Sequence, residues 1–304
     1  MSENILTVKD LKTYFYTASG IAKAVDGVSF NIAKGETMGI VGESGSGKSV
    51  TSSSIIRLLP PRTGKIVGGS IEFEGKDVLA LSKKELNDFR GKDIAVIFQD
   101  PMTSLDPVFK IGKQMTEMIM AHQNVTKDEA WKMAVEALSK VGIPEPEKRM
   151  NSYPYELSGG MCQRVIIAMA VCCKPKLIIA DEPTTALDVT VQAQVLELLK
   201  ELQRDMDTAI LLITHNLGVV WEMCDKVMVM YAGNTVEFTD TKTLYSNPRH
   251  PYTWGLLDSM PKLSDESKGE LKTIPGTPPD LRLTGECCNF YNRCPYVTEA
   301  CTQS

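Results

Sequence analysis

Residues 42–49 read GESGSGKS, and glycines at this spacing before a lysine and a serine can hold a phosphate group. An apolar run from Met38 to Val41 precedes the segment, and residues 50–56 follow as the start of a helix. The glycines let the backbone turn tightly, so that its N–H groups and the positive end of the helix face one point. The segment therefore predicts a phosphate-binding loop and a bound nucleotide.

The loop supplies two side chains with defined chemistry. Lys48 can reach the β- and γ-phosphates, and the Ser49 hydroxyl can ligate Mg²⁺. A glycine-rich turn with a chance Lys-Ser pair is the alternative, but it does not explain the flanking strand and helix. The residues expected to contact the nucleotide are Gly42, Ser44, Gly45, Gly47, Lys48, Ser49 and Val50.

Two adjacent carboxylates, Asp181 and Glu182, come directly after the apolar run 177–180. In a phosphate-loop fold, the carboxyl edge of the sheet is where the nucleotide lies. Asp181 is placed to hold Mg²⁺ and Glu182 to polarise the attacking water. Such a pair alone is more often solvated surface, but with the upstream loop it indicates a Walker B motif.

The composition and charge of the chain argue against several classes of protein. The chain has 304 residues and is 43% hydrophobic, yet no apolar run approaches the roughly 18 residues that span a bilayer. The N-terminus carries no signal-peptide pattern, so we expect a cytoplasmic protein that is soluble or meets a membrane only through a partner. The net charge of −5 disfavours a nucleic-acid partner. Eight cysteines in a cytosolic chain do not indicate a disulfide framework.

The elements that must position these residues follow from the apolar pattern. Apolar runs at 177–180, 209–214 and 227–231 are separated by a long predicted helix near 190–206. This alternation indicates an α/β fold with a parallel sheet covered by helices on both faces. Residues 94–98 predict a further apolar strand.

The N-terminal part predicts shorter strands. The runs 5–8, 23–32 and 36–41 are broken by Gly20, Gly27 and Gly35, and residues 70–75 alternate as a half-buried strand after Gly68 and Gly69. Thr126 and Glu129 form a capping box before a one-sided apolar helix, so a helical subdomain interrupts the strands between about 105 and 170. Beyond Asn234, repeated prolines predict a loop-rich tail.

Residues 157–161 read LSGGM and precede an apolar helix from Val165 to Val171. Ser158 is predicted to cap that helix. The segment resembles the signature sequence of ATP-binding cassette (ABC) proteins. The resemblance implies a cassette over 1–240, with a phosphate-loop core, an antiparallel β subdomain and the helical signature subdomain, and a C-terminal extension over 241–304. It also implies a head-to-tail dimer, in which Ser158 and Gly160 of one subunit meet the γ-phosphate held by the other.

Other positions match the same family. Gln99 matches the Q-loop, which touches Mg²⁺ and water; residues 186–188 match the D-loop with Asp188; His215 matches the switch histidine that contacts the γ-phosphate. The resemblance thus implies Glu182, His215, Lys48 and Gln99 as catalytic residues, and Ser49, Gln99 and Asp181 as Mg²⁺ ligands. An aromatic residue should stack on adenine; Tyr14, Phe15 and Tyr16 compete, and Phe15 is our choice. Met161 and Asn216 depart from the commonest family pattern, in which Gln and Asp occupy those positions.

The segments 98–107, 182–190, 247–253 and 274–279 are similar to the ATPase subunits of dipeptide/oligopeptide and nickel importers. This implies a peripheral motor at the cytoplasmic face of the membrane, with two permease subunits, an extracytoplasmic binding protein and a second ATPase, which is a related chain or a second copy. The cargo is most often a peptide, with nickel or another small solute as the alternative. A soluble ABC ATPase acting on nucleic acid or ribosomes usually has two cassettes or a long coiled coil, and this chain has neither.

Four cysteines crowd the tail: Cys287, Cys288, Cys294 and Cys301. In this subfamily such a tail resembles a site for a [4Fe–4S] cluster, and thiolates suit iron–sulfur or zinc chemistry. Family members usually have one further cysteine, so Cys287 is the fourth ligand, the chain is truncated, or the site has three cysteines or is empty. Free thiols, or a redox sensor that gates an importer, are the alternatives. The other cysteines, Cys162, Cys172, Cys173 and Cys224, are expected to pack in apolar surroundings.

Overall fold

The computed structural model describes residues 3–185, 187–260, 273–285 and 287–303. The chain divides into two compact units. The first unit comprises residues 1–5, 33–36 and 81–211, and the second comprises residues 6–32, 37–80 and 212–304. Within the described ranges, no helix combines the length and the apolar character needed to cross a membrane.

The second unit is built on a mixed sheet. Strand β3 (Thr37–Val41) pairs in parallel with β9 (Lys226–Tyr231), which pairs antiparallel with β10 (Asn234–Asp240). Every residue of β3 is buried, as expected for an apolar run inside a parallel sheet. Its partner β9 is buried from Val227 to Tyr231. The two strands direct their carboxyl ends to the same edge, where the phosphate loop begins.

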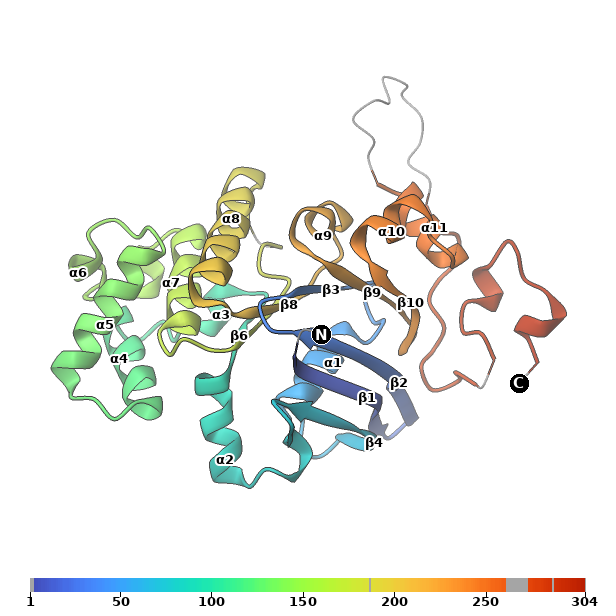
Figure 1. Ribbon diagram of the computed structural model, residues 1–304, viewed down its shortest axis with the longest axis horizontal. Helices are drawn as coiled ribbons and strands as arrows, with labels where there is room; N and C mark the ends of the chain where they lie inside the picture. The colour runs from blue at the N-terminus through green and yellow to red at the C-terminus, as the bar shows by residue number, and fades with distance from the viewer. Residues whose placement is uncertain (1–2, 186, 261–272, 286, 304) are drawn as a thin grey trace, which may run out of the picture. The chain divides into compact units, whose positions relative to one another are not determined.

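An antiparallel sheet completes the second unit, with the strand order β2-β1-β4-β5. Figure 1 shows β1, β2 and β4 side by side. Our prediction that Gly27 and Gly69 separate strands is wrong, because both lie inside long strands with φ of 84° and 87°. A Cβ on Gly69 would lie 2.4 Å from the Asp10 carbonyl oxygen, next to a shift in the β1–β4 register. The two glycines are therefore irregularities within strands. The bounds are β1 (Asn4–Thr17), β2 (Gly20–Ala33), β4 (Gly64–Phe73) and β5 (Lys76–Asp77).

The first unit carries the parallel pair β6 (Ile94–Ile97) and β7 (Leu177–Asp181). The 18-residue helix α8 (Val189–Met206) leads to β8 (Ala209–Ile213), which is fully buried. The Ala209 N–H donates to the Lys176 carbonyl at 2.9 Å, so β8 begins beside β7. The strand–helix alternation predicted from the apolar runs is observed.

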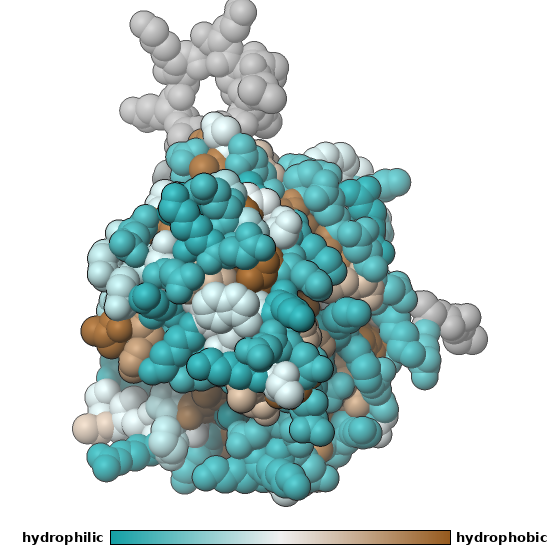
Figure 2. Space-filling view, turned by 90° about the vertical axis from the view of Figure 1, so that its left-hand side faces the viewer, coloured by the Kyte–Doolittle hydropathy of each residue, from teal (hydrophilic) through white to brown (hydrophobic). Residues whose placement is uncertain are grey.

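Four helices gather in the first unit (Figure 1): α4 (Ile111–His122), α5 (Lys127–Lys140), α6 (Pro146–Arg149) and α7 (Gly159–Val171). The predicted capping box is present, because the Thr126 hydroxyl accepts from the Glu129 N–H and the Glu129 carboxylate accepts from the Thr126 N–H. Helix α5 buries Ala130, Ala134 and Leu138 on one face. The side of the molecule shown in Figure 2 is mostly hydrophilic, with hydrophobic residues scattered between.

The tail is more regular than the sequence indicated. Strand β10 is followed by α10 (Thr241–Ser246) and α11 (Pro251–Asp258), each capped by the side chain before it. The Asp240 carboxylate accepts from the Thr243 N–H, and the His250 ring nitrogen accepts from the Tyr252 N–H. Pro251 is at the first helical position, where its missing N–H costs nothing. Pro251 thus starts a helix here, and the prediction of a loop-rich tail is only partly correct.

The remaining elements are short. They are α1 (Lys48–Ile55), η1 (Val78–Ala80), α2 (Lys83–Asp88), η2 (Phe89–Asp93), α3 (Pro101–Ser104), η3 (Pro154–Glu156), α9 (Leu217–Met223), η4 (Tyr291–Arg293) and η5 (Glu299–Cys301).

Candidate functional site

The phosphate loop joins the end of β3 to the start of α1, as its sequence predicts. Gly47 occupies the N-cap of α1 with φ of 104°, and no side chain makes a capping hydrogen bond there. A Cβ on Gly42 would lie 2.2 Å from the Met230 carbonyl oxygen, and a Cβ on Gly47 would lie 2.3 Å from the Ala24 carbonyl oxygen. Only glycine fits at these two positions, and the helix N-terminus lacks a side-chain cap.

The loop already holds its lysine in place. Lys48 is 6% exposed, and its ammonium donates to the carbonyl oxygens of Gly42 at 2.8 Å and Glu43 at 3.0 Å. The Ser46 hydroxyl is buried and has no hydrogen-bond partner among the described residues. A buried hydroxyl without a partner beside an uncapped helix N-terminus fits a phosphate group. Of the other predicted contacts, Ser44, Gly45 and Ser49 are exposed and Val50 is half-buried.

His215 follows β8 at the same sheet edge as the phosphate loop. The Thr214 N–H donates to the Ile40 carbonyl at 3.2 Å, so the ends of β8 and β3 are adjacent, and His215 is exposed just beyond. Asn216, the departure from the family pattern, caps α9 by accepting from the Gly218 N–H at 2.9 Å. Asparagine is among the best N-cap residues, so this position is locally well supported.

The three aromatic candidates on β1 face different surroundings. The Thr13 hydroxyl is 2.8 Å from the Ser54 hydroxyl of α1, and alternation places Phe15 on the same face. The Tyr14 hydroxyl donates to Asp26 at 2.8 Å, and burial together with this carboxylate raises the pKa of Tyr14 to about 12. Tyr16 lies beneath the Lys65 ammonium. Phe15 is thus the candidate on the side of the helix that leaves the phosphate loop.

In the first unit, the Glu182 carboxylate is held at the carboxyl end of β7. Its Oε2 accepts from the Gln99 amide at 2.9 Å and from the Thr185 hydroxyl at 3.0 Å. Glu182 has φ of 48°, a left-handed conformation that is uncommon for residues other than glycine. Such backbone strain clusters at functional sites. The structure therefore brings together two residues predicted separately, Gln99 and Glu182.

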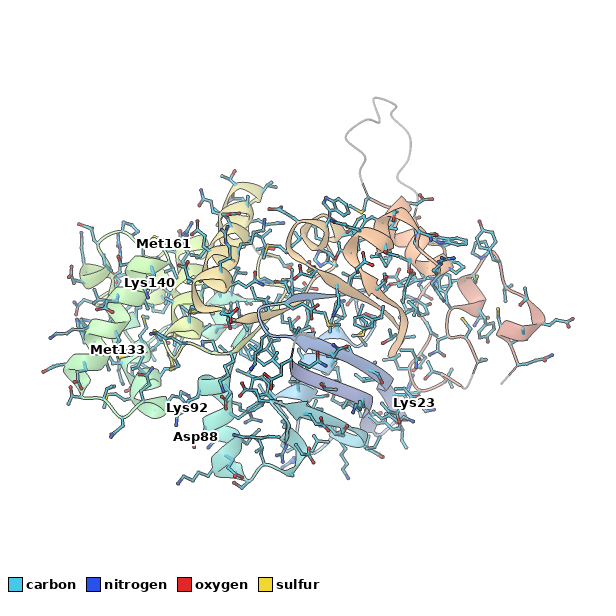
Figure 3. All side chains as sticks on the ribbon, viewed as in Figure 1. Lys23, Asp88, Lys92, Met133, Lys140 and Met161 are labelled. Atoms are coloured by element: carbon cyan, nitrogen blue, oxygen red, sulfur yellow. The ribbon has the colours of Figure 1, made fainter. Side chains whose placement is uncertain are left out.

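The signature segment forms the start of α7, and Met161, labelled in Figure 3, lies in the first turn of this helix. The Ser158 hydroxyl accepts from the Met161 N–H at 3.3 Å, which confirms the predicted cap. Ser158 is exposed, and Gly160 is half-buried. A Cβ on Gly160 would lie 2.8 Å from a Val191 methyl group, so this glycine permits close packing of α7 against α8. The start of α7 thus leaves the Ser158 side chain exposed.

Asp188 caps α8. Its carboxylate accepts from the Val191 N–H at 3.0 Å, and the Leu187 N–H donates to the Thr184 carbonyl at 3.1 Å. Ala186, the first residue of the predicted D-loop, lies outside the described residues. Asp188 therefore fixes the start of α8.

The described cysteines of the tail do not come together as a metal site. Across the described ranges, no three His, Cys, Asp or Glu side chains come close enough together to hold a metal ion. The Cys288 N–H donates to the Cys301 carbonyl, and the Cys301 thiol lies 3.4 Å from the Thr298 hydroxyl. The arrangement of Cys287, Cys288, Cys294 and Cys301 does not support an iron–sulfur cluster. Of the other four cysteines, three are buried and Cys173 is half-buried.

The predicted residues fall into two groups. The second unit holds Phe15, the phosphate-loop residues and His215, and the first unit holds Gln99, Ser158, Gly160, Asp181, Glu182 and Asp188. Two further residues were missed: Ser46, inside the predicted loop, and Thr185, which contacts Glu182. Thr185 follows Glu182 by three residues, and a hydroxyl at this spacing could have indicated the contact.

Comparison with known proteins agrees with this geometry. Residues 25–185 match the family "ABC transporter", and residues 236–301 match the family "Oligopeptide/dipeptide transporter, C-terminal region". The chain is 58% identical to the oligopeptide transport ATP-binding protein OppD of Bacillus subtilis (strain 168), over 91% of this chain and 77% of that protein. It is 52% identical to the dipeptide transport ATP-binding protein DppD of the same organism, over 98% of this chain and 89% of that protein.

Solved structures share the fold. The dimeric ATP-binding cassette MJ0796, in a post-hydrolysis state bound to ADP and Pi, is 27% identical with a TM-score of 0.69, covering 78% of this chain and 98% of its own. The cassette cbiO1 of Clostridium perfringens, part of the transporter complex cbiONQ, is 29% identical with a TM-score of 0.69, covering 81% of this chain and 92% of its own. With these matches over its phosphate loop and signature helix, the chain belongs to the ABC transporter ATP-binding family.

Proposed function

We propose that this chain is the ATP-hydrolysing motor subunit of a membrane importer for dipeptides or oligopeptides. The observation that carries the proposal is the Glu182 carboxylate, held by Gln99 and Thr185 at the end of β7. A fixed carboxylate at this edge suits the activation of water. The relatives named above are peptide-transport ATP-binding proteins, which supports peptides as cargo.

The phosphate loop binds and orients ATP in this proposal. The N–H groups at the start of α1 and the Lys48 ammonium stabilise charge on the β- and γ-phosphates, and Phe15 stacks on the adenine. Lys48 exchanges its bonds to the Gly42 and Glu43 carbonyls for bonds to phosphate oxygens. The loop is thus organised before the nucleotide arrives.

Hydrolysis uses the residues at the strand ends. Glu182 orients the attacking water and accepts its proton, while His215 contacts the γ-phosphate. Ser49, Gln99 and Asp181 are the proposed Mg²⁺ ligands, and oxygen donors of this kind suit that ion. Mg²⁺ would neutralise charge that develops on the transferred phosphoryl group.

The partners follow the family pattern. We propose a head-to-tail dimer with a second ATP-binding subunit, in which Ser158, Gly160 and Asp188 of one subunit complete the ATP site of the other. This dimer would lie at the cytoplasmic face of the membrane, where it contacts two transmembrane permease subunits. An extracytoplasmic binding protein completes the importer. MJ0796 forms a dimer, which supports this arrangement. Residues 1–240 would form the cassette and residues 241–304 the extension.

In importers of this kind, the binding protein and the permeases select the cargo. Nickel or another small solute is therefore the alternative cargo. A soluble ATPase without a permease is the less supported class. A [4Fe–4S] cluster in the tail stays a prediction, and we assign it no step because the described cysteines do not form a ligand set. Iron and labile-sulfide assays on anaerobically purified protein decide whether it exists.

Substitution at Glu182 tests the proposed function. Glu182→Gln keeps the size of the side chain but removes the base, so we expect the ATPase rate to fall at least about 100-fold while ATP binding persists. Glu201→Gln, an exposed position on α8, is the matched control and should hydrolyse ATP at the native rate. Unchanged turnover in Glu182→Gln would remove this residue from its role.

A further inference from the structure

The phosphate loop is held from outside by the C-terminal extension. Arg293, which ends the short helix η4, donates to both carboxylate oxygens of Glu43, at 2.6 Å and 3.0 Å. Glu43 is the second residue of the loop, and the two residues lie 250 positions apart in the sequence. Two parallel bonds between a guanidinium and a carboxylate fix orientation as well as distance. Both residues belong to the second unit.

All three nitrogens of the Arg293 guanidinium donate hydrogen bonds. Besides Glu43, its N–H groups donate to the Pro275 carbonyl at 2.8 Å, the Ile274 carbonyl at 3.2 Å and the Tyr231 hydroxyl at 3.3 Å. Its side chain is 5% exposed, against 28% for the Glu43 side chain. Arg293 is therefore a rigid anchor, and Glu43 is the group that it holds.

A second residue of the extension reaches the same point. The Glu43 N–H donates to the Tyr252 hydroxyl of α11 at 2.8 Å, and Tyr252 is fully buried. The Glu43 carbonyl accepts from the Lys48 ammonium at 3.0 Å and from the Ser46 N–H at 3.2 Å. Glu43 thus links the extension on one side to the phosphate-binding lysine on the other.

We propose that Arg293 and Tyr252 are positioning residues for ATP, which act through Glu43 to keep the phosphate loop in its binding conformation. The inference rests on the proposed function and extends it, because it assigns the extension a part in nucleotide binding. A loop that is already fixed loses less conformational freedom when ATP binds, so its anchors raise affinity without touching the ligand. Lysine cannot replace Arg293, because a single ammonium cannot make the paired contact.

ATP affinity of the full-length chain tests this assignment. Arg293→Gln, Glu43→Gln and Tyr252→Phe should each raise the ATP Kd, by about tenfold for the two charged positions, where a charge-assisted pair is lost. The KM should rise with the Kd while kcat stays within about threefold, since neither residue of the pair takes part in the proposed chemical step. The double variant of Arg293 and Glu43 should bind no more weakly than either single variant, because both changes break the same contact.

The controls separate positioning from folding. Arg282→Gln removes a surface arginine of the same extension whose partner is Asp280, and it should leave the ATP Kd unchanged. Arg293→Lys preserves the charge and should still bind weakly. If Arg293→Gln does not fold, Glu43→Gln, at the more exposed end of the pair, carries the test alone.

Two results would overturn the inference. One is a native ATP Kd in Glu43→Gln, and the other is a loss of ATP affinity in the Arg293 and Glu43 double variant that equals the sum of the two single losses. Failure of the native chain to bind or hydrolyse ATP would instead contradict the proposed function. The two failures are therefore distinguishable in one series of measurements.

Discussion

At the scale of single residues, the geometry of the phosphate loop depends on Gly47. Its φ of 104° is unfavourable for other residues, and an added Cβ would lie 2.3 Å from the backbone oxygen of Ala24. Gly45 also has a positive φ, but a Cβ there would meet nothing within 4 Å. Both positions need a residue that tolerates a positive φ, but only Gly47 also lacks room for a Cβ. Substitutions at the two glycines therefore measure these two requirements separately.

We expect Gly47→Ala to destabilise the chain by more than Gly45→Ala, whose cost should be about 1 kcal/mol. ATP affinity should fall at least about tenfold in Gly47→Ala, because the loop and the start of α1 must move to admit the methyl group. Denaturant unfolding and ATP titration measure the two effects. Equal losses in both variants would show that close backbone approach at Gly47 is unimportant.

The choice of Phe15 as the adenine-stacking residue leads to a second prediction. Phe15→Ala should weaken ATP binding by about tenfold, since stacking of an aromatic ring on a base contributes about 1–3 kcal/mol. Tripolyphosphate, which has no base, should bind the variant and the native chain equally. Tyr14→Phe removes only the bond to Asp26 and should leave ATP affinity nearly unchanged. Weakened tripolyphosphate binding in Phe15→Ala would indicate a distorted loop instead of lost stacking.

At the scale of elements, two helix caps of similar geometry differ in their proposed use. The hydroxyls of Thr126 and Ser158 each accept from a backbone N–H of the first turn, at 3.3 Å in both cases. Thr126 begins α5, outside the proposed ATP contacts, whereas Ser158 begins the signature helix α7. The pair compares a purely structural cap with one that is also proposed to contact the nucleotide.

Replacing either residue by Ala should lower the free energy of unfolding by about 1 kcal/mol. Only Ser158→Ala should also slow ATP hydrolysis in the assembled dimer, by about tenfold or more, because a hydrogen bond to the γ-phosphate is lost. Calorimetry and steady-state kinetics on the two variants check this. Native turnover in Ser158→Ala would contradict the proposed contact across the dimer.

The cysteines differ in how readily they ionise. Burial raises the pKa of the Cys224 thiol, whereas the hydrogen bond from Thr298 lowers the pKa of the Cys301 thiol. The thiolate is the reactive form, so Cys301 should become reactive at a lower pH than an ordinary cysteine and Cys224 only at a higher one.

Alkylation by iodoacetamide at pH 7 and pH 9, followed by mass spectrometry, checks this order. Cys301 should be modified at both pH values and Cys224 at neither. Similar rates at the two positions would contradict the structure. Protection of Cys301 that ends when iron is removed would support the iron–sulfur hypothesis.

At the scale of the whole molecule, local signals in the sequence predicted the phosphate loop, the Thr126 capping box and the alternation of strands and helices. The sequence predicts breaks at Gly27 and Gly69, because periodicity alone cannot distinguish a bulge from a turn. The elements β10, α10 and α11 are only six to eight residues long, and prolines stand between α10 and α11 and at the start of α11, so their patterns are weak. The Arg293–Glu43 contact leaves no local signal at all, since its partners are so distant in sequence.

The importer proposal is best tested by ATP hydrolysis of the chain purified from membranes with its neighbouring permease subunits. With a peptide and its binding protein added, we expect a several-fold higher rate than in the isolated chain, and near-complete loss of that rate in Glu182→Gln. A rate that does not respond to the permease, the peptide or the binding protein would contradict the proposed import function and favour a non-transport ATPase.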